Sequence, residues 1–80
     1  MRSARTGARL EIVSRIEKEI AELERRQAEL TAELEKPETY EKSGAALQVN
    51  RDLSAVMENL ERLTAEWEEA ASKLAALDAQ

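Results

Sequence analysis

The sequence predicts an all-α fold, an antiparallel two-helix coiled-coil hairpin, from its composition, its apolar spacing and its one cluster of helix breakers. Ala, Glu, Leu, Lys and Arg dominate the 80 residues, which is typical of long helices and coiled coils. The only aromatic residues are Tyr40 and Trp67. Because a chain this short and this poor in bulky side chains cannot build a globular core, helix pairing is the expected source of burial.

Two stripes of mostly apolar residues alternate at intervals of three and four, the spacing of a coiled-coil seam. The first stripe consists of Val13, Ile16, Ile20, Leu23, Gln27, Leu30 and Leu34. The second consists of Val49, Leu53, Val56, Leu60, Leu63, Trp67, Ala70, Leu74 and Leu77. We call these two stripes the seam. They predict one helix over about residues 12–36 and another over about residues 45–78, inside a hairpin domain at 12–79.

Residues 37–44 are the predicted turn between the helices. Pro37 cannot continue the first helix, and Gly44 permits backbone angles that other residues avoid. Either Ser43 or Thr39 is a candidate cap for the second helix. A connection this short makes the two helices antiparallel neighbours.

Doubling the chain back at this turn predicts a register in which paired seam residues have numbers that sum to about 83. The expected pairs are Leu34 with Val49, Leu30 with Leu53, Gln27 with Val56, Leu23 with Leu60, Ile20 with Leu63, and Ile16 with Trp67. The first helix also carries Glu11–Arg15 and Glu22–Arg26 pairs four residues apart, and the second carries Glu58–Arg62 and Glu69–Lys73. We expect these pairs to lie on the outer faces.

Several classes of function are excluded by composition. The chain has no Cys and no His, so disulfides, thiolate zinc sites and imidazole catalysis are not available. No phosphate-binding loop or nucleophile motif is present, and the carboxylates fall outside the seam. We therefore expect no catalytic residue, no metal ligand and no cofactor in this chain.

The N-terminal residues 1–11 are basic and precede the seam. They lack the apolar centre of a secretory signal, and no apolar stretch is long enough to span a bilayer. We interpret 1–11 as a flexible linker or cloning remnant, and we expect the protein to be cytoplasmic. The net charge of −5 argues against a wholly basic, nucleic-acid-binding surface.

The basic side chains outside the seam are the remaining candidates for function. The candidate nucleic-acid contacts are Arg15, Lys18, Arg25, Arg26, Lys36, Lys42 and Arg51. Acidic residues interrupt this set, so an ordinary charged surface is the competing interpretation. Tyr40 lies in the turn, where it either caps the preceding helix or contacts a partner. Trp67 is interpreted as a packing residue, with a contact to a neighbouring domain as the alternative.

Three segments resemble the C-terminal coiled-coil domain of class F ATP-binding cassette (ABC-F, Uup-type) ATPases. These segments are residues 16–24, residues 32–40 with their Pro-x-x-Tyr turn, and residues 60–69, whose Glu-Trp-Glu run is similar to the Glu-x-Trp-Glu-like segment of the family. Pro37, Tyr40 and Trp67 match the distinctive positions. The resemblance implies a non-catalytic arm that contacts DNA or ribosomal RNA, or positions the ATPase on it. It places ATP and magnesium in the cassette domains of a parent protein.

Two other functions remain open from the sequence. A self-associating helical hairpin, forming a homodimer through a four-helix assembly, is the first, because two helices alone bury little surface. A tRNA-contacting arm similar to that of valyl-tRNA synthetases is the second, although the positions of Tyr40 and Trp67 fit that pattern less well.

Overall fold

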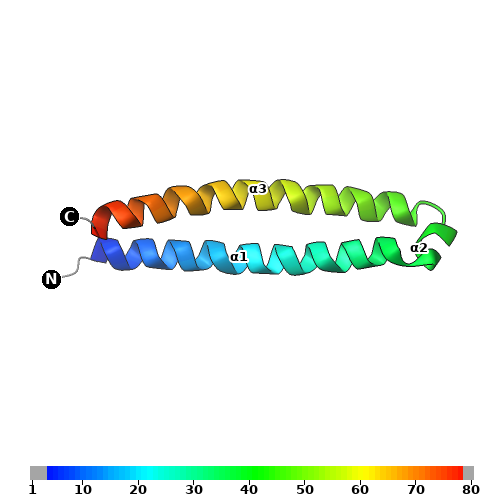
Figure 1. The fold of residues 1–80 in the computed structure, drawn as a ribbon, viewed down its shortest axis with the longest axis horizontal. Helices are drawn as coiled ribbons and strands as arrows, with labels where there is room; N and C mark the ends of the chain where they lie inside the picture. Colours follow the sequence, from blue (N-terminus) through cyan, green and yellow to red (C-terminus); the bar gives the residue numbers. More distant parts are fainter. Residues whose placement is uncertain (1–3, 79–80) are drawn as a thin grey trace.

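The computed structural model describes the backbone of residues 4–78 and the side chains of residues 9–77. Two long helices, α1 (Ala4–Glu35) and α3 (Ala45–Asp78), are joined by the short helix α2 (Pro37–Glu41). Figure 1 shows α1 and α3 side by side and antiparallel, with α2 at the tip, and the molecule extends 61 × 14 × 14 Å. The predicted antiparallel helical hairpin is confirmed.

The core of the hairpin is a narrow line of seam residues rather than a globular interior. The buried apolar side chains are Ile16, Leu30, Val56, Leu63 and Ala70, and all five belong to the predicted seam. None of the described side chains is fully enclosed. Since each helix buries only one stripe, the stability of the hairpin depends on a few large seam contacts.

The register of the seam agrees with the predicted pairing in the half of the hairpin away from the tip. Ile16, Leu63 and Ala70 form one buried cluster, and Trp67 and Ile20 pack against it. The indole Nε1 of Trp67 also donates a hydrogen bond of 3.2 Å to a carboxylate oxygen of Glu17, next to Ile16. This contact places Trp67 opposite Ile16, as the register requires.

Helix α1 is longer at its N-terminal end than the sequence interpretation allowed. It begins at Ala4, whereas the predicted helix began near residue 12 and residues 1–11 were assigned to a linker. The reason is local: residues 8–11 (Ala-Arg-Leu-Glu) favour helix, and the cost of Gly7 is only about 1 kcal/mol. Residues 1–3 of the predicted linker lie outside the described residues.

The predicted turn contains a helix of its own. Lys36 is extended (φ −83, ψ 126), as expected before a proline, and Pro37 begins α2, where its missing N–H costs no hydrogen bond. The second bend uses Gly44, whose φ of +76 lies in the left-handed region. A Cβ atom added at Gly44 would meet nothing within 4 Å, so the backbone angle, and not crowding, favours glycine there.

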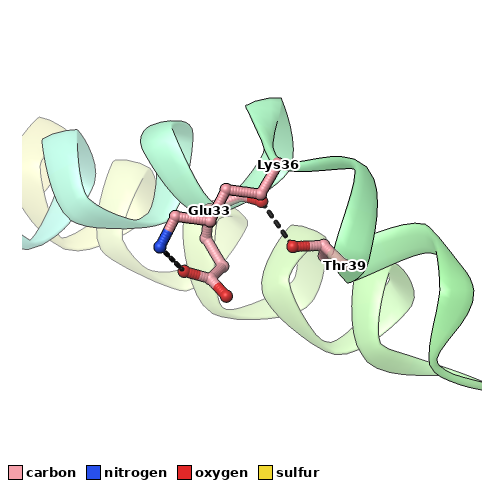
Figure 2. Close-up of polar contacts among 3 residues, drawn as sticks. All are labelled: Glu33, Lys36 and Thr39. Atoms are coloured by element: carbon pink, nitrogen blue, oxygen red, sulfur yellow. Dashed lines mark hydrogen bonds and ion pairs between the residues drawn. The ribbon is translucent and has the colours of Figure 1, made fainter.

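Side chains of α2 close the end of α1. The buried Thr39 hydroxyl donates a 2.6 Å hydrogen bond to the backbone carbonyl of Glu33, and the Lys36 ammonium lies 3.4 Å from the Glu33 carboxylate (Figure 2). The Tyr40 hydroxyl donates a 2.7 Å bond to the carbonyl of Leu34. Helix C-termini leave such carbonyls without partners inside the helix. Thr39, a predicted cap for the second helix, therefore caps the first.

Candidate nucleic-acid interface

Between residues 12 and 77, the cations of the two long helices lie on one side of the hairpin. In the heptad lettering abcdefg, the seam takes positions a and d, and the antiparallel pairing brings the g positions together on one flank and the e positions on the other. Between residues 12 and 77, every Lys and Arg of α1 and α3 occupies a c, f or g position: Arg15, Lys18, Arg25, Arg26, Arg51, Arg62 and Lys73. We call these positions the cation-bearing side.

The b and e positions of the same helices form the cation-free side. Its charged residues are all acidic: Glu17, Glu24, Glu35, Glu61 and Glu68. Between them lie small or uncharged residues and two exposed large apolar side chains, Leu47 and Met57, which are 57% and 51% exposed. Phosphate groups would meet only repulsion or neutral surface on this side.

The cation-bearing side is mixed in charge, and its distinctive feature is a local cluster of three arginines. Arg25 and Arg26 of α1 and Arg62 of α3 line one shallow groove of about 490 Å³. The rest of its lining is Glu19, Glu22, Leu23, Glu29, Asn59 and Leu63. All three arginines are exposed at the surface. The groove thus gathers cations from both helices near the middle of the hairpin.

The guanidinium groups of the groove are not held by the nearby carboxylates. Among the described residues, no carboxylate lies within 4.0 Å of Arg25, Arg26 or Arg62. Of the four pairs predicted along the helices, Glu69–Lys73 forms, at 3.0 Å, whereas Glu11–Arg15, Glu22–Arg26 and Glu58–Arg62 do not. Exposed pairs gain little because the attraction is weak in water and holding long side chains costs entropy. The planar guanidinium donors remain available to a phosphate.

The other predicted contacts are dispersed. Arg15, Lys18 and Arg51 are exposed but do not line the groove. Lys36 and Lys42 lie at the tip, before and after α2, and the Lys36 ammonium is paired with Glu33. The structure therefore brings together two of the seven predicted basic contacts.

Arg62 is a member of the cluster that the sequence interpretation left out of its contact residues. The predicted register already indicated this position. When Leu23 is paired with Leu60, Arg62, two residues further along α3, comes to lie across from Glu22 of α1. Applying the register to the flanking positions, and not only to the seam, would have placed Arg62 in the groove. Asn59, which also lines the groove, is found in the same way.

The two aromatic residues take different roles. The indole N–H of Trp67 is bonded to Glu17 and its ring packs on the seam cluster, so Trp67 is a packing residue. Tyr40 is a cap through its hydroxyl, and yet its side chain is 62% exposed.

A second groove lies near the open end of the hairpin. It is lined by Arg9, Ile12, Ile16, Glu66, Glu69, Ala70 and Lys73.

Within residues 9–77, no group of three or more carboxylates is arranged to hold a metal ion. In the described part of the chain, neither long helix has a stretch apolar enough to serve as a membrane span.

Comparison with known proteins identifies the family. The model of the ABC transporter C-terminal domain matches residues 9–72, which include most of α1, all of α2 and most of α3. No curated protein and no solved structure matches the chain. Since the match covers most of the hairpin, including the tip and the arginine groove, the chain belongs to the ABC transporter C-terminal domain family.

Proposed function

We propose that this domain is the C-terminal arm of a cytoplasmic ABC-F, Uup-type ATPase and that it contacts DNA or ribosomal RNA through the arginine groove. The family match supports a C-terminal accessory domain of an ABC protein, and Pro37, Tyr40 and Trp67 support the finer assignment. ATP and magnesium would be bound by the parent's cassette domains. The arm itself would be non-catalytic.

The observation that carries the proposal is the convergence of Arg25, Arg26 and Arg62 on one groove, where none of them has a carboxylate of the described side chains within 4.0 Å. Guanidinium groups bind phosphate oxygens with two parallel hydrogen bonds, which suits a sugar-phosphate backbone. The cation-free side offers no cation to a phosphate, so the contact would be one-sided. A domain of net charge −5 with three available cations would position a parent protein rather than anchor it.

Titration of the isolated domain with fluorescent duplex DNA and duplex RNA, followed by anisotropy, tests the proposal. Three phosphate contacts on B-DNA predict a salt slope of about −2.7, which is a loss of about 40-fold in affinity between about 50 and about 200 mM salt. Binding that is absent at low salt, or that does not respond to salt, would contradict the proposal.

A matched pair of variants separates the groove from net charge. The double variant Arg25→Ala and Arg26→Ala changes the net charge from −5 to −7, and so does the double variant Ala28→Glu and Ser54→Glu on the cation-free side. Both alter exposed helical positions. We expect the first pair to reduce the salt slope by about 2 and the second to leave it unchanged. An equal reduction of the salt slope in the two double variants would show that binding depends only on the total charge.

A second candidate function is self-association, and the exposed Leu47 and Met57 favour it. These two side chains lie on the cation-free side, where the glutamates of a second copy would repel those of the first. We therefore expect a monomer by light scattering. A dimer that Met57→Lys dissociates would instead support an interaction hairpin. The family match argues against the third function, the arm of a valyl-tRNA synthetase.

A further inference from the structure

The tip of the hairpin presents an aromatic ring that packing does not explain. Tyr40 is 62% exposed, which makes it the most exposed large apolar side chain among the described residues. It belongs to α2, at the opposite end of the molecule from the start of α1 and the end of α3 (Figure 1). Its hydroxyl accounts for the cap on Leu34, but the cap does not use the ring face.

The exposed ring is held in place by two adjacent hydrogen bonds. The Tyr40 hydroxyl bonds to the Leu34 carbonyl at 2.7 Å, and the neighbouring Thr39 hydroxyl bonds to the Glu33 carbonyl at 2.6 Å. Thr39 is only 4% exposed, so α2 is packed against the end of α1 at this point. A ring fixed in advance loses little conformational entropy when a partner binds it.

The charges at the tip limit what the ring can bind. Lys36 and Lys42 flank α2, but α2 itself carries the exposed Glu38 and Glu41. The tip therefore has no excess of positive charge with which to attract a duplex backbone. An unpaired base offers a neutral π face that projects away from its phosphate, and such bases stack on exposed Tyr, Phe and Trp rings.

We propose that the Tyr40 ring is a stacking platform for an unpaired base of the nucleic acid that the domain contacts. This inference rests on the proposed function, because it names the structural class of nucleic acid that the domain would distinguish. Phosphates would contact the arginine groove, and the tip would respond to bases in a loop, bulge or single-stranded end. A fully paired duplex would contact the groove without engaging the tip.

The test compares an RNA stem closed by a loop of unpaired nucleotides with a fully paired duplex of the same stem. We expect Tyr40→Ala to weaken binding of the looped stem by about 5- to 150-fold, the range for losing one stacked base, and to change duplex binding by less than about twofold. Tyr40→Phe keeps the ring and removes the hydroxyl bond. We expect it to bind the looped stem within about threefold of the wild-type chain.

A fluorescent base analogue, 2-aminopurine, placed in the loop provides a second readout. We expect the wild-type chain and Tyr40→Phe to change its emission and Tyr40→Ala to leave it unchanged. Circular dichroism of each variant verifies that the helices are intact.

The outcomes distinguish this inference from the proposed function. If Tyr40→Ala binds the looped stem as the wild-type chain does, while the change of Arg25 and Arg26 to Ala weakens binding, stacking is wrong and the arginine groove stands. If Tyr40→Phe and Tyr40→Ala lose affinity equally and the wild-type chain does not change the 2-aminopurine emission, the hydroxyl cap matters and the ring does not contact a base, which also overturns stacking. If the wild-type chain binds neither RNA at low salt, the proposed function itself is contradicted.

Discussion

The two sides of the hairpin share one seam and the same pair of helices, and both carry glutamates, yet between residues 12 and 77 only one side carries cations. The cation-bearing side carries the arginine groove, whereas the cation-free side carries glutamates around the exposed Leu47 and Met57. The fold does not depend on this contrast, because the buried residues of the long helices all belong to the seam, which lies between the two sides. Flanking positions of a coiled coil can therefore specify binding while the seam specifies the fold.

The largest effect is expected from a substitution in the seam, which the two sides share. Leu63 is 5% exposed and belongs to the cluster with Ile16 and Ala70. We expect Leu63→Ala to reduce the free energy of unfolding by about 2–4 kcal/mol, because it deletes buried surface and leaves a cavity. Urea unfolding followed by circular dichroism measures this loss. The exposed Leu47→Ala is the control and should change the free energy by less than about 0.5 kcal/mol.

A reversal of charge in the groove should remove the cluster of cations that distinguishes the two sides. Changing Arg25, Arg26 and Arg62 to Glu gives a net charge of −5 − 6 = −11 and leaves the seam intact. We expect the affinity for nucleic acid to fall by at least about 100-fold, or about 2.7 kcal/mol, in anisotropy titrations at low salt. Retained affinity in this variant would mean that the groove is not the interface.

The tip fixes how the helices align, and thus which flanks meet. Gly44 has a φ of +76, and its Cβ position is free of neighbours. We expect Gly44→Ala to destabilise the hairpin by about 1 kcal/mol through backbone strain alone, as measured by the shift in the urea midpoint. An unchanged midpoint would show that the tip adopts another conformation at no cost.

The smallest effect is expected on the cation-free side. Replacing Glu24 and Glu61 with Lys brings the net charge to −5 + 4 = −1. Weaker general repulsion should raise affinity by less than about threefold at moderate salt, with no change in the number of phosphate contacts. A salt slope steeper by about 2 would show instead that phosphates reach this side and that the contrast between the sides has no functional meaning.

Most of the fold could be predicted from the sequence because the seam has a simple period. The alternation from Val13 to Leu34 and from Val49 to Leu77, together with Pro37, specified two helices, their antiparallel order and their register. The start of α1 could not be predicted from the seam, since its first residues lie beyond the seam. The α2 helix was missed because a five-residue helix has no periodicity, and tertiary hydrogen bonds from Thr39 and Tyr40 hold it.

The candidate site was less predictable than the fold. A charge on a helix can be assigned to a face from its position, but the grouping of Arg62 with Arg26 emerges only when the register is applied to the flanking positions as well as to the seam. Whether an exposed pair such as Glu22–Arg26 forms depends on a balance of weak terms that spacing does not determine.

The most direct test of the central claim, that one side of the hairpin contacts nucleic acid, is an NMR titration of the ¹⁵N-labelled domain with duplex DNA at low salt. We predict that amide shift changes concentrate at Arg25, Arg26, Asn59 and Arg62, around the groove. Backbone amides of Ala21, Ser54 and Glu61, on the other side, should move little. Changes that are equal on both sides, or larger around Ser54 than around Arg62, would contradict the account.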